Sequence, residues 1–436
     1  MDDPPPEPSS TPAARTDSPH IALKYRDFRL FQSARLTSVL SSEMVAVAVA
    51  WQVYEITHSA LSLGYVGLAQ FLPSFLLFLL AGHVVDRFDR RRVLQCVQFS
   101  YAVIVGLLLL YTLSGATGTA PIYVILVLQG TVRAFGGPAG QALMPQLVPE
   151  EHFANAVTWG SSTFMTATIV GPGLGGVVYG WLGGAAAVYG LATVTYLISF
   201  FFTSAIRTRT GRMEPRAASL DTLLAGFRYV WSNQIILGSI SLDLFAVLLG
   251  GAVALLPIFA SNVLHVGVRG LGLLRAAPSL GAMVMAVLLA FHPLEKRAGR
   301  LMYLGVLIFG AATVGFGLSR SLLLSLLLLV LIGASDMVSV VVRQTLVQVQ
   351  TPSRVRGRVS AVNMLFIGTS NQFGEFESGI TAQWWGAVPA TVVGGLGTLA
   401  VVSLWWRFFH ALRRVDNLKR AGLADTALEV QAEAAD

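Results

Sequence analysis

The fold is indicated most clearly by the stretch Gly82-His-Val-Val-Asp86-Arg87-Phe-Asp-Arg90-Arg91, which connects two long apolar runs. Arginines grouped between apolar runs are typical of a loop on the cytoplasmic side of a membrane. The glycine, followed four residues later by an acid and an arginine, indicates more than a basic loop. The glycine permits two helices to approach closely, and the charges can form a network that holds one conformation and breaks in another. The residues of this predicted gate are Gly82, Asp86, Arg87 and Arg90.

The composition excludes most soluble proteins. Of 436 residues, 54% are hydrophobic and 12% are charged, whereas a soluble domain carries about 25% charged residues. The sequence holds no GxxxxGK[ST] phosphate loop, so direct use of ATP is not expected. The 7 histidines are scattered and predict no metal site, and with 1 cysteine no internal disulfide can form. We predict that the chain is not an enzyme.

Apolar runs long enough to cross a bilayer recur along the chain. Because lipid offers no hydrogen-bond partners to the backbone, such runs are expected to form helices. We predict an all-α membrane protein with twelve transmembrane helices. The runs lie at about 33–55, 65–84, 93–114, 120–144, 157–181, 184–206, 236–261, 269–291, 301–319, 321–346, 359–384 and 388–410.

Lysines and arginines gather in alternate loops, which predicts that both termini are cytoplasmic. The net charge of +7 follows from this pattern and predicts no nucleic-acid partner. We expect a disordered cytoplasmic tail at 1–19, six-helix lobes at 20–206 and 236–412, and a cytoplasmic tail at 413–436. The linker at 207–235 has apolar residues at helical spacing, which predicts an amphipathic helix on the inner membrane surface; a soluble linker helix is the alternative.

Several glycines and prolines recur at nearly equal offsets in the two halves. At an offset of 203, Gly130 falls on Gly333 and Gly176 falls on Gly379, and at an offset of 205, Gly67 falls on Gly272. Repeats on either side of a central loop predict two pseudo-symmetric lobes, an arrangement that suits a transporter moving around a central site.

A second motif is predicted to shape the fifth span. A proline removes one helical hydrogen bond and kinks the helix, and glycines beside it permit close packing. Ordinary packing of small residues is the alternative to a gating role. The residues of this motif are Gly171, Pro172, Gly175 and Gly176.

These two motifs resemble those of the major facilitator superfamily. Its signature between helices two and three is G-x-x-x-D-R-x-G-R-R, from which this chain departs at Asp89. The resemblance implies that Asp86 faces the start of the eleventh helix and holds the outward-open state. The G-P-x-x-G-G frame is similar to the antiporter motif of exporters, although Ala167 stands where a glycine is usual.

Three further stretches resemble the enterobactin-exporter branch of that superfamily, also called transmembrane secretion effectors. They are LFQSARLTS near the start, LLAGFRYVWSN at 223–233 and VQVQTPSRVRGRVSAVN at 347–363. The resemblance covers about 24–412 and implies export of siderophores or other amphipathic small molecules.

Ionisable residues occur in all four spans that line the central cavity in this superfamily, namely spans 1, 4, 7 and 10. A charge in hydrocarbon costs about 2.5–3.5 kcal/mol or more, so such residues usually face a cavity or a partner. We predict that Glu43 and Asp243 couple transport to protons; static ion pairs with Arg133 or Arg343 are the alternative. The residues are Glu43, Arg133, Asp243, Asp336 and Arg343.

Three more charges fall toward the outer half of spans eight and eleven, where they predict an outer gate or a structural ion pair. They are Arg275, Glu375 and Glu377.

Together these features predict a monomeric, proton-driven exporter in the cytoplasmic membrane. Its expected partners are a small-molecule substrate and the bilayer, and it is expected to need no cofactor. An importer or uniporter of the same fold, and a non-transporting membrane sensor, are the alternatives.

Overall fold

The computed structural model describes residues 20–208, 220–292, 294 and 297–415. The predicted tail at 1–19, positions 416–436 of the other predicted tail, and 209–219 of the predicted linker lie outside the described residues. No strand occurs within the described ranges, and nearly all of their residues are helical.

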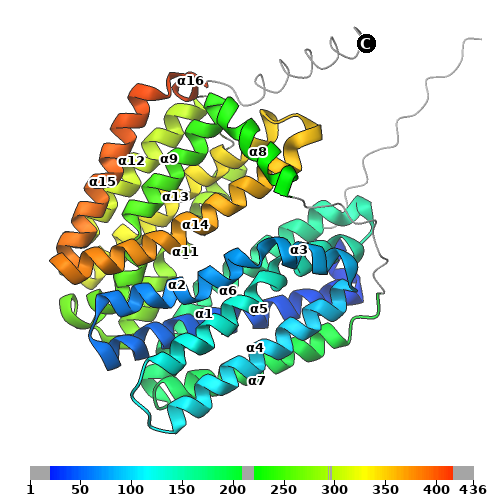
Figure 1. The fold of residues 1–436 in the computed structure, drawn as a ribbon, viewed down its shortest axis with the longest axis vertical. Coiled ribbons are helices and arrows are strands. Elements are labelled where there is room, and N and C mark those ends of the chain that lie inside the picture. Colours follow the sequence, from blue (N-terminus) through cyan, green and yellow to red (C-terminus); the bar gives the residue numbers. More distant parts are fainter. Residues whose placement is uncertain (1–19, 209–219, 293, 295–296, 416–436) are drawn as a thin grey trace, which may run out of the picture.

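The first lobe contains the elements from η1 to α7 (Figure 1). Their bounds are η1 Ile21–Lys24, α1 Arg26–Thr57, α2 Ala60–Leu76, α3 Phe78–Arg87, α4 Arg90–Leu113, α5 Ala120–Leu143, η2 Met144–Gln146, η3 Glu150–His152, α6 Phe153–Trp181 and α7 Ala185–Ser204.

The second lobe follows helix α8, Leu220–Ser232. Its bounds are α9 Gln234–Gly250, η4 Ala252–Leu255, α10 Leu256–Ile258, the π-helix η5 Phe259–Val263, α11 Gly267–Phe291, α12 Ala298–Leu318, α13 Leu322–Val349, α14 Ser353–Trp385, α15 Ala387–Phe408 and α16 His410–Arg413.

These elements are consistent with the predicted twelve helical passes. Within the described residues, 9 helices are long and apolar enough to cross a membrane, and the bent pair α2 and α3 makes 10. Helices α6 and α14, with 29 and 33 residues, also exceed the length of about 20 residues that a crossing needs. They are less apolar because α6 is rich in small polar residues and α14 carries arginines and two glutamates.

The two lobes are pseudo-symmetric, as the internal repeat predicts. A Cβ atom on Gly130 of α5 would lie 2.2 Å from the Gln70 carbonyl oxygen of α2, and one on Gly333 of α13 would lie 1.9 Å from the Pro278 oxygen of α11. Each glycine therefore lets one helix press against the backbone of another at the equivalent place in its lobe. The prediction of an all-helical fold of two similar lobes is confirmed.

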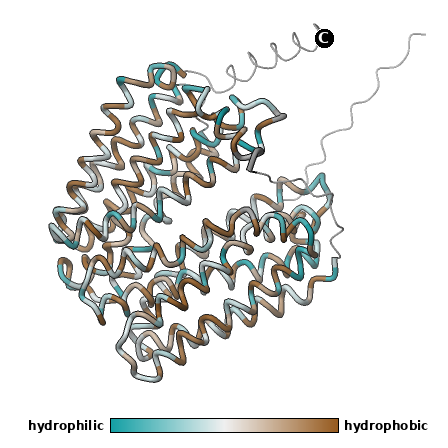
Figure 2. The backbone as a smooth tube through the Cα atoms, viewed as in Figure 1, coloured by the Kyte–Doolittle hydropathy of each residue, from teal (hydrophilic) through white to brown (hydrophobic). Residues whose placement is uncertain are grey.

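The outer surface of the bundle suits lipid. Figure 2 shows hydrophobic residues along the middle of most helices and hydrophilic residues mainly near their ends. Large apolar side chains remain exposed on the flanks of both lobes, including Leu110, Val124, Val194, Leu304 and Leu327. Such a surface is stable only where hydrocarbon covers it, which agrees with a multi-pass membrane protein.

The two ends of the bundle differ in charge. The arginine-rich end, as we call it, carries the α3–α4 connection, the first turn of α1, helix α8 and the start of α14. The opposite, arginine-poor end carries the loops that follow α1, α4 and α6. The charge pattern predicts that the arginine-rich end is cytoplasmic.

This orientation predicts which residues an impermeant thiol reagent reaches in intact cells. In a Cys96→Ser background, a cysteine at Thr117, exposed in the loop after α4, is expected to react. A cysteine at Ser232, exposed at the end of α8, is expected to react only after the membrane is permeabilised. The reverse labelling pattern would show that the orientation is inverted.

Candidate functional site

The lobes are in close contact at the arginine-poor end, and their ribbons diverge toward α3 and α8 (Figure 1). A Cβ atom on Gly176 of α6 would lie 2.7 Å from the Val268 carbonyl oxygen and 3.1 Å from the Gly272 Cα atom, both on α11. On the other side of the interface, a Cβ atom on Gly379 of α14 would lie 3.0 Å from the Gly64 Cα atom of α2. The lobes thus meet through two pairs of glycines.

Hydrogen bonds fasten the same end. The Asn262 side-chain amide donates to the Tyr54 hydroxyl at 2.8 Å, and the Ser59 hydroxyl donates to the Gln383 amide oxygen at 3.0 Å. Arg269 of α11 donates to the Gly180 carbonyl oxygen at 3.0 Å, and its guanidinium lies over the Trp181 ring. Each of these bonds has to break before the arginine-poor end can open.

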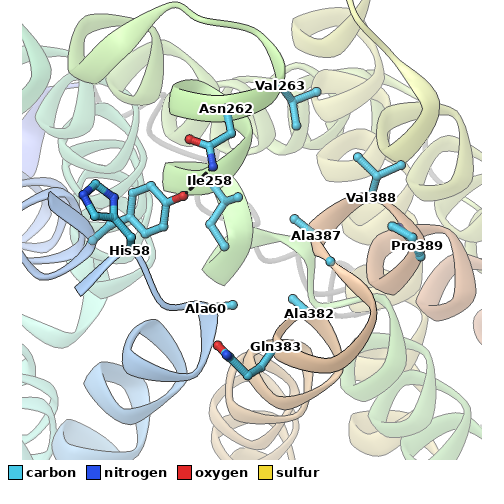
Figure 3. Close-up of a pocket in the computed structure, with 12 residues that line it drawn as sticks. His58, Ala60, Ile258, Asn262, Val263, Ala382, Gln383, Ala387, Val388 and Pro389 are labelled. Atoms are coloured by element: carbon cyan, nitrogen blue, oxygen red, sulfur yellow. Dashed lines mark hydrogen bonds between the residues drawn. The ribbon is translucent and has the colours of Figure 1, made fainter. Parts of the chain in front are cut away.

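A cavity of about 430 Å³ lies among these contacts, between the end of α1, the π-helix η5 and the α14–α15 connection (Figure 3). Tyr54 and His58 line it from the first lobe, and Asn262 and Gln383 line it from the second. Because both lobes form its walls, the cavity exists only while this end is closed.

The glycines of the α6 motif serve two faces of that helix. A Cβ atom on Gly171 would lie 2.6 Å from the Glu43 Cβ atom, and one on Gly175 would lie 2.9 Å from the Met44 Cα atom, both on α1. Gly176 faces α11 instead, and Pro172 is buried within the helix. The motif therefore packs α6 between its own lobe and the other lobe, while its gating role stays a prediction.

The α3 motif has no such contact in this conformation. A Cβ atom on Gly82 would meet nothing within 4 Å. Asp86 is half-buried, Arg87 is exposed and Arg90 is buried, and α3 packs mainly against α5 of its own lobe. Helix α8 instead packs against the start of α14. A Cβ atom on Gly226 of α8 would lie 2.8 Å from the Arg358 carbonyl oxygen of α14. The structure does not show the predicted meeting of Asp86 with the start of α14, which stays a prediction.

Helix α8 joins the second lobe at the arginine-rich end. The Tyr229 hydroxyl donates to the Gln350 carbonyl oxygen at 2.8 Å, and the Phe227 ring lies 5.4 Å from the Phe366 ring. Leu224 and Trp231 remain exposed. The predicted linker helix is therefore present, and one part of its apolar surface covers the start of α14.

The charges of the second lobe form a buried group. Asp243 of α9 and Arg343 of α13 are an ion pair with exposed fractions of only 4% and 2%. The Ser339 hydroxyl donates to the other Asp243 oxygen at 3.0 Å. Asp336, two turns before Arg343, interacts electrostatically with both members of the pair. Of the alternatives open for Asp243, the structure shows the ion pair with Arg343.

A second group of charges extends across the lobe interface, and we call it the interlobe charge cluster. It consists of Glu43 of α1, Arg133 of α5, Arg275 of α11 and Glu375 of α14. Both glutamates interact electrostatically with both arginines, so each carboxylate has one partner in its own lobe and one in the other. The sequence placed Arg275 and Glu375 with the outer charges, and the structure brings them to Glu43 and Arg133.

The surroundings of this cluster differ from one residue to the next. A Cβ atom on Gly67 of α2 would lie 2.6 Å from the Glu375 Oε2 atom, so the carboxylate presses against the other lobe's backbone. The Arg275 Nε atom is buried without a hydrogen-bond partner. Arg133 is exposed in the middle of its helix, which at that depth requires a polar surrounding such as water between the lobes.

Glu377 stands apart from the cluster. It is half-buried, and neither Arg133 nor Arg275 interacts with it electrostatically.

Within the described part of the chain, no group of three His, Cys, Asp or Glu side chains could hold a metal ion.

A family model described as transmembrane secretion effector matches residues 17–432. The chain belongs to this family, a branch of the major facilitator superfamily. The enterobactin exporter EntS of Citrobacter koseri is 28% identical over 387 residues, which are 89% of this chain and 92% of that relative. The enterobactin exporter EntS of Escherichia coli O81 is 27% identical over 387 residues, with the same coverage.

Solved transporter structures share the fold of this transmembrane secretion effector. The POT family transporter PepTSo superimposes with a TM-score of 0.69 at 11% identity, covering 90% of this chain and 99% of that one. A bacterial homologue of the human lysosomal transporter Spinster, in an inward-facing and unoccupied conformation, gives a TM-score of 0.67 at 15% identity, covering 92% and 98%.

Sequence reasoning missed the residues that close the arginine-poor end of this transmembrane secretion effector. Tyr54, Ser59, Asn262 and Gln383 are single polar residues separated by long stretches of sequence. Nothing in their local pattern indicates that they meet. The glycine repeats were the available signal, since Gly176 and Gly379 are repeat-equivalent and both lie at lobe contacts.

The glycine contacts predict that bulk at Gly176 weakens the closed end. Gly176→Leu is expected to cost the closed conformation about 1–3 kcal/mol, the usual range for overpacking, and thus to reduce its population about tenfold. Cross-linking of cysteines placed at Ser59 and Gln383 by a short thiol reagent measures that population.

Gly173→Leu is the matched control, because a Cβ atom on Gly173 meets nothing within 4 Å. Its cross-linking is expected to equal that of the parent protein. Equal cross-linking in Gly176→Leu would show that this glycine does not hold the lobes together.

The buried pair of the second lobe predicts a stability effect. Asp243→Asn removes the ion-paired partner of the buried Arg343 guanidinium, and breaking a buried pair in this way typically costs about 3–5 kcal/mol. We expect a lower unfolding temperature of the purified protein, and the double variant Asp243→Leu with Arg343→Leu is expected to restore most of the loss. An unchanged unfolding temperature in Asp243→Asn would contradict a structural role for the pair.

Proposed function

We propose that this chain is a proton-coupled exporter of small amphipathic molecules, such as siderophores or drugs, that works by alternating access in the bacterial cytoplasmic membrane. Membership of the transmembrane secretion effector family and similarity to enterobactin exporters support this proposal. In it, the chain acts as a monomer with both termini in the cytoplasm, and the proton gradient takes the place of a cofactor.

Alternating access requires that one end of the transporter closes while the other opens. With the arginine-rich end in the cytoplasm, the contacts among α2, α6, α11 and α14 close the outer end, and the conformation is inward-facing. The α3 motif, whose Gly82 is free of close contacts here, is then available to pack against the second lobe in the outward-facing state.

The observation that carries proton coupling is the interlobe charge cluster. Glu43 and Glu375 lie on different lobes and share Arg133 and Arg275. While both glutamates are ionised, the attraction joins the lobes and favours the inward-facing state. A proton on either carboxylate removes one cross-lobe attraction and shifts the equilibrium by that difference in energy.

Asp243 is assigned a different role from the one its position in span seven suggested. Its partner Arg343 belongs to the same lobe, so the pair can stay intact while the lobes move. We therefore assign coupling to Glu43 and Glu375 and a structural role to Asp243.

The test compares two modes of transport in proteoliposomes, with enterobactin as the cargo. Glu43→Gln and Glu375→Gln are expected to abolish uphill transport driven by an imposed pH gradient. Counterflow exchange, which needs no net proton movement, is expected to persist at a reduced rate. Glu150→Gln, an exposed acid at the arginine-rich end, is the control and is expected to keep both modes.

The direction of flux tests export itself. In inverted membrane vesicles, an interior acidified by the vesicles' own proton pumps should drive cargo inward. Full uphill transport in both glutamate variants would remove the cluster from the coupling step, and accumulation in right-side-out vesicles instead would identify an importer.

A further inference from the structure

Arg35, near the arginine-rich end of α1, has no carboxylate partner among the described residues. It lies on α1, eight residues before Glu43, which places it about 12 Å nearer the arginine-rich end. The side chain is half-buried, and no ion pair joins it to a described acid. An unpaired charge that is partly buried is costly unless water or an anion meets it.

The surroundings of Arg35 hold its guanidinium against α6. Its Cζ atom lies 5.8 Å from the centre of the Phe164 ring, within the range of a cation–π contact. A Cβ atom on Gly160 would lie 2.9 Å from the Arg35 Nη1 atom, so only glycine leaves room for the guanidinium at this place.

Gln32 is a second unpartnered polar group beside the same point. Its Nε2 atom lies 3.5 Å from the position of that Gly160 Cβ, and its exposed fraction is 6%. Neither the Nε2 nor the Oε1 atom has a hydrogen-bond partner. A buried amide with both groups unsatisfied costs free energy that a ligand would recover.

This part of α6 has a polar exposed face. Thr158, Ser161 and Ser162 are exposed at the level of Gly160, whereas Val170, Leu174 and Val177 are exposed farther along the helix on its apolar side. Hydroxyl groups suit a water-filled space between the lobes better than lipid. Phe164, at 44% exposure, stands beside Arg35 between these two faces.

We propose that Arg35, Gln32 and Phe164 form a recognition site for the acidic group of an aromatic organic anion. The guanidinium binds a carboxylate, or a comparable oxyanion, through two parallel hydrogen bonds. The exposed Phe164 face lies where it can contact the aromatic ring of the same molecule. The Gln32 amide supplies a further hydrogen bond once its side chain turns toward the ligand.

The proposal rests on the proposed export function only for the identity of the ligand as cargo. In that function the site faces the cytoplasm and meets the cargo before it reaches the interlobe charge cluster. Binding itself can be measured on the purified protein whether or not it transports.

The test uses 1-naphthoate and its uncharged counterpart 1-naphthamide, both radiolabelled, in equilibrium dialysis with the full-length protein in lipid-free detergent. The parent protein is expected to bind naphthoate at least about tenfold more tightly than naphthamide, as one charge-assisted hydrogen bond requires. Arg35→Gln is expected to remove this preference, and Arg35→Lys to retain only part of it.

Two further variants distinguish a specific loss of the binding site from a general loss of the folded structure. Gly160→Ala displaces only the far end of a flexible side chain, so we expect a folded protein with about tenfold weaker naphthoate binding. Arg407→Gln replaces an exposed arginine at the end of α15 and is expected to bind naphthoate as the parent protein does.

The outcomes decide between cargo, lipid and no site. Equal binding of both probes by the parent protein, or unchanged naphthoate binding in Arg35→Gln, overturns the proposal. Displacement of naphthoate by micellar phosphatidylglycerol in the parent protein, but not by phosphatidylcholine, also overturns it, because the anion would then be a lipid headgroup. Selective binding in a protein that fails every transport assay would support the site and refute only the export function.

Discussion

The structure depends on how closely helix backbones can approach where the two lobes meet. In a bilayer the hydrophobic effect does not drive one helix onto another, since lipid chains are as apolar as the side chains, so association relies on packing and hydrogen bonds. Gly176 against Gly272 and Gly379 against Gly64 provide that packing on the two sides of the interface. Because a backbone contact of this kind either forms or does not, it suits an interface that alternates between two states.

The charged residues of the helices form two groups, one with its partners inside a single lobe and one with partners in both lobes. Asp243 and Arg343 neutralise each other inside one lobe, where a rigid-body movement of the lobes leaves them unchanged. Glu43, Arg133, Arg275 and Glu375 are shared between lobes, so the same movement must alter their interactions. Electrostatic energy changes with conformation only in the second group, which is the requirement for coupling ion movement to transport.

Arg35 is in a third kind of environment, because no described residue supplies its counter-ion. Pairing with an internal carboxylate would have been the simplest way to lower the cost of partly burying this charge. Glycine at position 160 keeps space for the guanidinium beside an aromatic ring instead. In the proposed site the ligand supplies the counter-ion, which would let the protein discriminate between anionic and neutral cargo.

The sequence by itself determined the spans, their grouping into similar halves and the family. Apolar length, arginine clusters and repeated glycines are properties of single segments, and the bilayer imposes its length and charge requirements on each segment separately. The sequence also marked the charges of spans 1, 4, 7 and 10, because any ionisable residue there is exceptional. Tertiary structure alone decided their partners. Asp243 pairs with Arg343, which lies 100 residues later in the chain. Glu375 comes close to Arg133, a partner of Glu43, only because the two lobes are in contact. Such pairings depend on the rotation and crossing of packed helices, which no single segment encodes.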